Sequence, residues 1–468
     1  MSARDRSWTV APTLLWFAGC LVLALLVFDG DMQAVADRFT APRRSANPEA
    51  TGGPTFTARP LTVADSTEAA EEDTAKPVAP VAADRSKILA LEDTCLDGAP
   101  PSCKKWAMDG FYRAIAQSKQ HKLGRAVRVS WYGDSVIATD AIPGRLRTLL
   151  QTELGDGGPG YVFVVPPHRF CGHEAIIRGS GGTWQSHAIS TMQVPDGLYG
   201  VGGGTAETED GRVSIKLVNG TVSHAELYYL EQPHGGTATI TADGKPLTTV
   251  ETKGAAKLAG YAATTIDGGA RKFDIATSGR VRLFGLDLEN DTGAVVDNLG
   301  VISVNVKSFN NHNADHFTAE LAHRGADLIL IMIGANEAQW LGPTDADTKS
   351  YAEHYGKTLA LVRKARPDAA CLVVSPTDQA EAKDGDYPSR PVMPVLVAAQ
   401  RAAARAAGCA FYSTYDWMGG KGSAAKWFRK GLVGTDFQHL SRNGANRLSE
   451  SLYGTLMAGY QKYASQTP

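Results

Sequence analysis

The run Asp327–Ile333 is continuously apolar after its aspartate, which is typical of a parallel strand buried on both faces. Helical and strand patterns alternate around it over the last third of the chain. The sequence predicts strands at Cys371–Ser375 and Cys409–Tyr412, and helices at about 312–323, 347–366, 391–407 and 442–463. This alternation predicts an α/β fold, a doubly wound or flavodoxin-like three-layer domain.

The stretch Val127–Ser135 predicts a further strand with one buried face, because apolar residues alternate with Arg128 and Ser130. It ends at Gly133-Asp134-Ser135, and leucines at helical spacing follow within Ile142–Leu154. Open α/β sheets place their active sites at the carboxyl ends of strands. The hydroxyl of Ser135 is therefore a candidate nucleophile, although Gly-Asp-Ser alone also marks ordinary turns.

Between about 176 and 296 the pattern changes to short alternating runs separated by turn signals such as Asn219-Gly220 and Asp243-Gly244. Such a pattern indicates an antiparallel β-sandwich. We therefore expect an all-β module over 176–296 that interrupts an α/β domain, whose two parts span 86–175 and 297–468.

The N-terminal segment, 1–40, carries an uncharged apolar run, 11–28, long enough for a membrane-spanning helix. Arg4 and Arg6 precede the run and acidic residues follow it, which predicts export of the remaining chain. A cleaved signal peptide is the alternative to a retained anchor. Residues 41–85 are rich in Ala, Pro and Thr and predict a disordered linker. The expected location is therefore membrane-anchored, with the catalytic domain in the periplasm or at the cell surface.

The formal net charge of −2 gives no sign of the basic face that nucleic-acid binding requires. The six cysteines form no dense Cys/His cluster, so a structural zinc site is not expected. Cys95 and Cys103 flank a short loop that a disulfide would close in an oxidising compartment. Cys371 and Cys409 open consecutive strands, and either a disulfide or two buried thiols fits them.

Two more short motifs fall where the α/β pattern places strand or helix ends. Gly334-Ala335-Asn336 follows the apolar strand, so the Asn336 amide is able to donate to a developing oxyanion. Asp436 and His439 come just before the last helix. Their spacing allows the carboxylate to hold the imidazole while its other nitrogen faces a serine.

Together these three motifs resemble the SGNH (GDSL-type) hydrolase family, in the family's order. Gly133-Asp134-Ser135 is similar to its first block, Gly334-Ala335-Asn336 to its Gly-x-Asn block and Asp436-x-x-His439 to its last. The resemblance implies a serine esterase with Ser135 as nucleophile, His439 as general base and Asp436 as orienter. It also implies that Asn336 and the Ser135 backbone N–H stabilise the oxyanion, with no cofactor and no metal.

The family takes a further oxyanion donor from a glycine in its second block, which here resembles Asp297–Val304. Aligned on Gly300, this block has Ser303 where a second glycine is usual. The resemblance therefore implies Ser303, and after it Gly300, as backbone donors. Glu337 replaces the common aspartate after Asn336.

An inserted β-sandwich between the first and second blocks resembles the organisation of bacterial peptidoglycan O-acetylesterases, whose module looks like a carbohydrate-binding domain. The sequence of the segment Leu283–Gly300 is similar to the corresponding segment of that group. The resemblance implies removal of O-acetyl groups from an acylated cell-envelope polysaccharide. An O-acyltransferase on the same scaffold and a non-catalytic glycan-binding surface protein are the alternatives.

Two groups of side chains have a structural and a functional interpretation. His312 and His316 are four residues apart on an expected helix, and zinc ligation is the less favoured interpretation. Among the tryptophans that could stack on sugars, Trp131 is expected in the core. Trp340, four residues after Asn336, is the candidate substrate-binding wall of the cleft.

Overall fold

A computed structural model describes residues 84–191 and 193–466, all within the compact unit Pro77–Pro468. The apolar run 11–28 and the linker lie outside these residues. Within the part described, no helix combines the length and apolar character that crossing a membrane requires.

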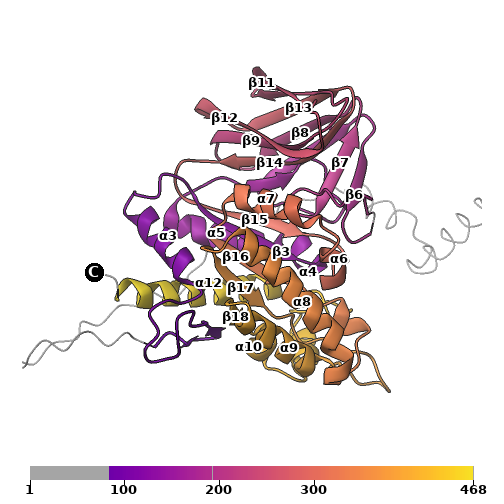
Figure 1. Ribbon diagram of the computed structural model, residues 1–468. Coiled ribbons are helices and arrows are strands. Elements are labelled where there is room, and N and C mark those ends of the chain that lie inside the picture. The colour runs from indigo at the N-terminus through magenta and orange to yellow at the C-terminus, as the bar shows by residue number, and fades with distance from the viewer. Residues whose placement is uncertain (1–83, 192, 467–468) are drawn as a thin grey trace, which may run out of the picture. The chain divides into compact units, whose positions relative to one another are not determined.

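The centre of the α/β part is a seven-stranded sheet in the order β1-β2-β18-β17-β16-β3-β15 (Figure 1). Five of its strands are mutually parallel, namely β18, β17, β16, β3 and β15. At the other end of the sheet, β2 runs antiparallel to β18 and pairs with β1 in a hairpin. The strand bounds are β1 Lys87–Ile88, β2 Leu91–Glu92, β3 Val127–Gly133, β15 Ala294–Gly300, β16 Leu328–Met332, β17 Ala370–Val374 and β18 Ala410–Tyr412.

Helices cover both faces of this sheet, as the strand–helix alternation predicts. One apolar core joins the sheet to α3 (Asp109–Lys119), α5 (Ala141–Leu154) and α12 (Arg442–Ala464). The other joins it to α7 (Ala314–Arg324), α8 (Asp345–Ala365) and α9 (Met393–Ala406). The sequence places α5, α7, α8, α9 and α12 within a few residues of their observed ends. The remaining short helices are α4 Ser135–Ala138, α6 Val306–Phe309, η1 Glu337–Gln339, α10 Thr414–Met418 and α11 Ser423–Arg429.

The prediction that the strand at 127–133 has only one buried face is wrong. Val127, Val129 and Trp131 enter one core, while Ser130 and Tyr132 on the other side are also buried. Ser130 is accommodated there because its hydroxyl donates to the Asp297 carboxylate at 2.7 Å. The strand is therefore central to the sheet, between β15 and β16.

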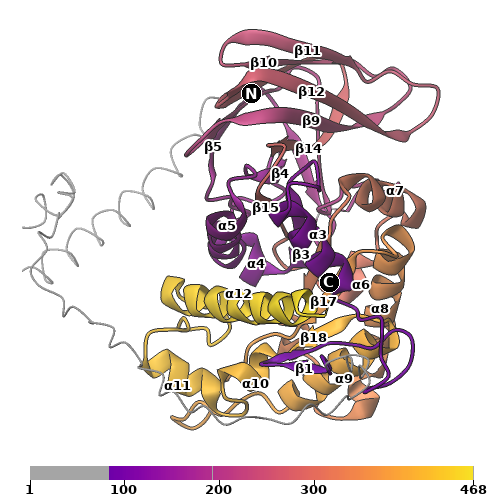
Figure 2. The same cartoon turned by 90° about the vertical axis from the view of Figure 1, so that its left-hand side faces the viewer.

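Two further antiparallel sheets lie one above the other at the top of Figure 2 and share an apolar core. The first has the order β11-β10-β13-β8-β5 and the second the order β12-β9-β14-β7-β6. Their bounds are β5 Ile176–Gly181, β6 Gln185–Ala188, β7 Gly204–Thr208, β8 Arg212–Leu217, β9 Val222–Glu231, β10 Thr237–Ala242, β11 Lys245–Glu251, β12 Leu258–Ala270, β13 Lys272–Ser278 and β14 Val281–Glu289.

These sheets are joined to the α/β part by strand pairing, buried ion pairs and a shared apolar core. The strand β4 (Gly160–Phe163), which precedes the expected module, pairs with β14. Arg324 of α7 is fully buried and binds Asp287 on β14 at 3.1 Å and Asp297 on β15 at 2.8 Å. Tyr228 and Phe284 share a core with residues of α7. The β-rich sheets are therefore part of the packed structure around the second block rather than a loosely attached unit.

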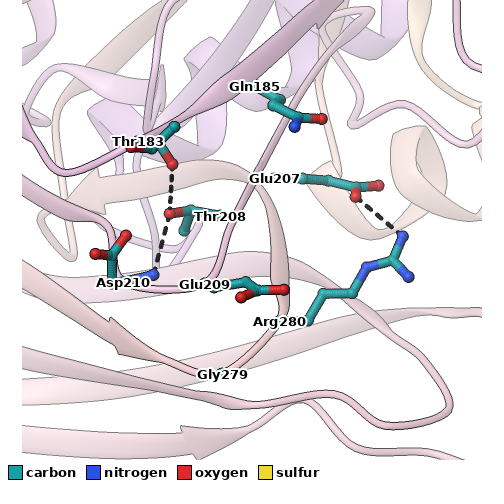
Figure 3. A pocket seen from close by; sticks show the side chains of 8 residues that line it. All are labelled: Thr183, Gln185, Glu207, Thr208, Glu209, Asp210, Gly279 and Arg280. Atoms are coloured by element: carbon teal, nitrogen blue, oxygen red, sulfur yellow. Dashed lines mark hydrogen bonds and ion pairs between the residues drawn. The ribbon is translucent and has the colours of Figure 1, made fainter.

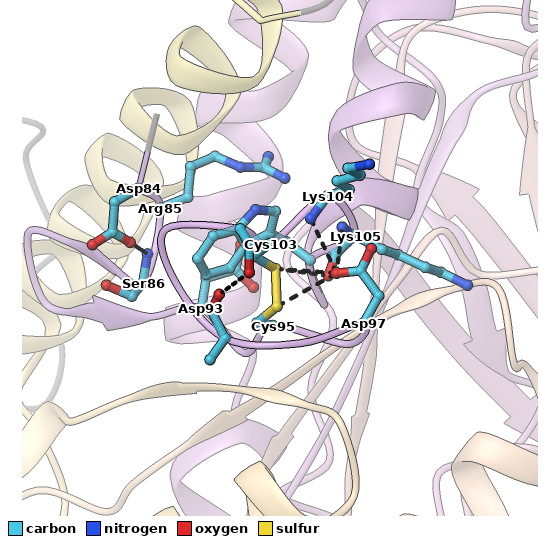
Figure 4. Close-up of a disulfide and its surroundings, with 12 residues drawn as sticks. Asp84, Arg85, Ser86, Asp93, Cys95, Asp97, Cys103, Lys104 and Lys105 are labelled. Carbon is cyan, nitrogen blue, oxygen red and sulfur yellow. Dashed lines mark hydrogen bonds between the residues drawn. A yellow bond between two sulfur atoms is a disulfide. The ribbon is translucent and has the colours of Figure 1, made fainter. Parts of the chain in front are cut away.

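Both candidate cysteine pairs form disulfides. The Cys95–Cys103 bond closes the loop before α3, and the Asp97 carboxylate accepts the backbone N–H groups of Lys104 and Lys105 beside it (Figure 4). The Cys371–Cys409 bond is buried and joins β17 to the residue that precedes β18. The alternative of two free thiols at 371 and 409 is therefore not observed.

Candidate active site

Ser135 begins α4 directly after β3, at the carboxyl end of a central parallel strand. The turn is tight: a side chain at Gly133 would lie 2.3 Å from Ile137, so only glycine fits. The preceding residue, Asp134, caps α4 by accepting the backbone N–H of Val136 at 3.0 Å. Because Ser135 is the first helical residue, its own N–H has no partner within the helix.

His439 connects Ser135 to Asp436. Its Nε2 lies 2.7 Å from the Ser135 hydroxyl oxygen, and its Nδ1 lies 2.6 Å from Asp436 Oδ2. The other carboxylate oxygen of Asp436 accepts the backbone N–H groups of Gln438 and His439, each at 3.0 Å. A carboxylate that accepts the Nδ1 proton leaves Nε2 free to accept the serine proton.

The environment of Asp436 favours its ionised form. Partial burial acts to raise the pKa of this carboxyl. Hydrogen bonds from the backbone and ring of His439 and from the backbone of Gln438 outweigh that effect, and the pKa is lowered. The carboxylate is therefore charged at neutral pH and able to stabilise an imidazolium on His439.

Asn336 lies after β16, beside β3, and reaches the same edge of the sheet. One N–H of its amide donates to the Val304 carbonyl at 2.8 Å, which holds the side chain against the loop that follows β15. Among the described residues the second N–H of the amide has no acceptor, so it is able to donate to a substrate atom.

The loop after β15 makes a turn over 301–304, in which the Val304 N–H donates to the Val301 carbonyl at 3.2 Å. Ser303 occupies the third position with φ +61°, a conformation that favours glycine. The serine thus keeps the backbone conformation that a glycine in the family's second block would supply. Within the described part of the chain, the Ser303 N–H has no hydrogen-bond partner.

Gly300 has a different role from the one the sequence implies. Its N–H donates to the Asn298 side chain at 3.0 Å, so it is not free to bind an oxyanion. A side chain at this position would lie 2.4 Å from the Ala138 backbone nitrogen. Gly300 is therefore required for the close approach of β15 to α4, and the prediction that it is a donor is wrong.

Trp340 ends the short helix that follows Asn336 and is 59% exposed. It lies on the chain next to the site with its ring accessible to a ligand. Trp131 is buried in the core, as expected.

His312 and His316 do not share a helix face, because α7 begins at Ala314. The His312 ring packs between Tyr199, Phe309 and Phe317, and the His316 ring packs against Phe284. Burial lowers the pKa of His312 to about 3 and that of His316 to about 4, so both are neutral at physiological pH.

Three glutamines that no motif marks connect the site's loops. Gln339 Nε2 donates to Gln379 at 2.6 Å and to Gln438 at 3.0 Å, and Gln379 donates to the Ala335 carbonyl at 2.9 Å. They bring the loop of Asn336 and the loop of His439 together. No local pattern in the sequence identifies residues whose partners lie so far along the chain.

Asp134 and Glu337 are buried beneath the site, and desolvation raises the pKa of their carboxyls to about 6 and about 7. Glu337 accepts the backbone N–H of Val306 at 2.8 Å and so links the Asn336 loop to α6. Its replacement of the common aspartate therefore has a structural use.

Comparison with known proteins agrees with this geometry. Residues 260–446 match the GDSL-like lipase/acylhydrolase family, a range that includes Asn336, Asp436 and His439. No curated protein sequence matches the chain.

Among solved structures, a peptidoglycan O-acetylesterase superposes with a TM-score of 0.66 at 24% identity, over 76% of this chain and 97% of the other. An acetyl xylan esterase matches at 13% identity and a TM-score of 0.27, over 34% of this chain and 79% of its own. The acetylxylan esterase Axe2 of Geobacillus stearothermophilus matches at 20% identity and a TM-score of 0.26, over 35% and 73%. The first of these likenesses shows a shared fold.

Proposed function

We propose that this chain, a carboxylic ester hydrolase of the SGNH (GDSL-like) type, removes O-acetyl groups from a cell-envelope polysaccharide such as peptidoglycan. The observation that carries the proposal is the continuous line from Asp436 through His439 to Ser135, with heavy-atom distances of 2.6 and 2.7 Å. This geometry is what a general base needs to take the proton of an attacking hydroxyl.

In the first half of the reaction, the Ser135 oxygen attacks the carbonyl carbon of the acetyl ester while its proton passes to His439 Nε2. The negative charge on the carbonyl oxygen is stabilised by the Ser135 and Ser303 N–H groups and the free N–H of Asn336. Collapse of this intermediate breaks the bond to the sugar oxygen, which leaves as an alcohol after receiving the proton from His439.

In the second half, a water molecule attacks the acetyl-Ser135 ester and gives its proton to His439 Nε2. The second intermediate collapses, the serine oxygen is reprotonated and acetate leaves. Asp436 keeps the imidazole in one tautomer throughout and stabilises its charged form.

The accessibility of the site supports a polymeric substrate. The His439 and Asp436 side chains are 42% and 52% exposed, so a chain is able to approach them without threading into an enclosed cavity. The two disulfides support export to an oxidising compartment, where a cell-envelope glycan is found. Retention by an N-terminal membrane helix is part of the same proposal.

A cavity of about 750 Å³ between β6, β7 and the start of β14 supports a role of the β-rich sheets in holding the polymer. Its walls are polar, and the side chains of Glu207 and Arg280, which both line it, form an ion pair at 3.2 Å (Figure 3). Directly after β6, the Ser190 hydroxyl donates to the Ile302 carbonyl at 2.7 Å, next to Ser303. One strand therefore connects this cavity to the oxyanion loop.

The deciding experiment measures acetate released from acetylated cell wall by the wild-type protein and by Ser135→Ala. Loss of a triad serine commonly costs on the order of 10⁶ in kcat. We expect no acetate above background from the variant, with an unchanged unfolding temperature. Activity of the variant within tenfold of the wild type would show that Ser135 is not the nucleophile. A wild type that is active only on nitrophenyl acetate would show that the proposed substrate is wrong.

A further inference from the structure

The turn that follows β15, residues 301–304, has a conformation that its own sequence does not favour. The Val304 N–H donates to the Val301 carbonyl at 3.2 Å, and Ser303 is the only residue of the turn with a positive φ, +61°. A positive φ confined to the third position defines a type II turn, in which glycine is preferred there. A type I turn gives this position a negative φ, which suits a serine better. Another part of the molecule must therefore hold the type II form.

The two turn types differ in the orientation of the central peptide unit, which joins Ile302 to Ser303. In a planar trans peptide, the carbonyl and the N–H point in opposite directions. A change from type II to type I turns this unit over and exchanges the two directions. Whatever holds the Ile302 carbonyl therefore also sets the direction of the Ser303 N–H, the proposed oxyanion donor.

A hydroxyl from the β-rich part holds that carbonyl. The half-buried Ser190, two residues after β6, donates its hydroxyl proton to the Ile302 carbonyl at 2.7 Å. The residue before it is fixed in turn, because the Ile189 N–H donates to the Gly203 carbonyl at 3.0 Å. The Ile189 side chain also shares an apolar core with Val301. Within the described part of the chain, no other group donates to the Ile302 carbonyl.

The two ends of the turn are attached to the catalytic segments. The Val301 N–H donates to the carbonyl of Gly133, two residues before Ser135, at 2.9 Å. The Val304 carbonyl accepts the Asn336 amide at 2.8 Å. These bonds fix the ends of the turn and leave its central peptide unit to be oriented by Ser190.

We propose that Ser190 is a positioning residue of the esterase, which keeps the Ser303 N–H directed at the ester carbonyl oxygen by holding the other end of the same peptide unit. This inference rests on the proposed function. It makes the β-rich part a component of the oxyanion site in addition to its role in holding the polymer. Loss of one oxyanion donor costs about 10²–10³ in kcat. Because the turn without Ser190 still populates type II in part, Ser190→Ala should lower kcat about ten- to hundredfold.

The first test compares 4-nitrophenyl acetate with O-(4-nitrophenyl) thionoacetate, in which sulfur replaces the carbonyl oxygen. Sulfur is a weak hydrogen-bond acceptor, so the oxyanion donors contribute less to hydrolysis of the thionoester. Ser190→Ala should therefore lower kcat for the oxygen ester more than for the thionoester, with little change in KM. Ser190→Thr, which keeps the hydroxyl, should retain most of the activity.

The matched control is Ser186→Ala. Ser186 is a half-buried serine on β6 whose hydroxyl donates to the Pro166 carbonyl at 3.0 Å, away from the oxyanion turn. Its replacement removes the same kind of hydrogen bond from the same strand and should leave both kinetic constants unchanged.

The second test is a double-mutant cycle with Ser303→Gly. Glycine at the third position favours the type II turn without external support. The loss of kcat caused by Ser190→Ala should thus be several-fold smaller when residue 303 is glycine. A residue that only stabilised the fold would cause the same loss in both backgrounds.

Equal losses on the oxygen ester and the thionoester, an Ser190→Ala protein with wild-type kcat, or additive losses in the cycle would each overturn the role of Ser190 and leave the esterase assignment in place. A wild type that hydrolyses neither nitrophenyl acetate nor acetylated cell wall would instead overturn the proposed function. If Ser190→Ala does not fold, Ser190→Cys takes its place in both tests with the same expected direction, because a thiol is a weak donor of similar size.

Discussion

Gln339 donates to Gln438 at 3.0 Å, and this hydrogen bond joins the loop that carries Asn336 to the loop that carries His439. Gln438 lies directly before His439 and is almost fully buried. Asn336 and His439, the proposed oxyanion donor and general base, come from segments about a hundred residues apart, so their relative position depends on contacts of this kind. Gln339 is therefore a positioning residue.

Replacement of Gln339 by alanine should lower kcat for an acetyl ester about tenfold, because a small displacement of the catalytic groups is costly to the rate. KM should change less than kcat, since the substrate is not expected to touch this side chain. Steady-state kinetics on nitrophenyl acetate measures both. Gln461→Ala, on the exposed face of α12, is the control and should retain wild-type kinetics. An equal loss in both variants would contradict the role.

Asp436→Asn should reduce kcat by roughly 10⁴, the size of the analogous loss in serine proteases. The asparagine amide would donate to His439 Nδ1 and so favour the tautomer that has no lone pair toward Ser135. The measurement is kcat at pH 8, with circular dichroism to show an intact fold. A decrease smaller than tenfold would mean that another group orients the imidazole.

The pH dependence of stability should reflect Glu320, which is fully buried and accepts the Val201 N–H at 3.1 Å. Burial raises the pKa of this carboxyl to about 8, against about 4.5 in an unfolded chain. Its contribution to stability is thus complete below about pH 4.5 and is lost as pH rises through 8.

Glu320→Gln removes this titration. The free energy of unfolding of the variant, relative to that of the wild type, should therefore be higher at pH 9 than at pH 5. Each unit of pKa difference corresponds to about 1.4 kcal/mol. Unfolding by urea at the two pH values gives the comparison. An identical stability difference between variant and wild type at both pH values would show that Glu320 does not titrate in this range.

The polar cavity of the β-rich sheets should affect polymers selectively. A site that holds the polymer raises the effective concentration of its acetyl groups, to about millimolar for short tethers. Glu209→Gln with Asp210→Asn should therefore raise KM for acetylated polymer relative to KM for nitrophenyl acetate. Loss of activity on both the polymer and nitrophenyl acetate would indicate that the cavity residues only support the fold around the site. An unchanged ratio of the two KM values would indicate that the cavity binds something other than the polymer.

The sequence by itself determined the α/β class and picked out Ser135, His439 and Asp436 as candidate catalytic residues, because the strand pattern and the motifs are short-range features. The apolar run before Gly334, the tight turn at Gly133 and the spacing of Asp436 and His439 are local, and each predicts a strand end or a loop without knowledge of its neighbours. The observed contact of Ser135 with His439 follows once the strands are placed in one parallel sheet.

Only the tertiary structure decided which backbone groups are free and which side chains lack partners. Asn298 captures the Gly300 N–H, whereas Ser303 takes the left-handed turn that leaves its own N–H unpaired within the described part. The membership of β4 in a β-rich sheet likewise depends on residues distant in sequence. Hydrogen bonds and ion pairs form between groups that packing brings together, and a linear pattern carries no record of that proximity.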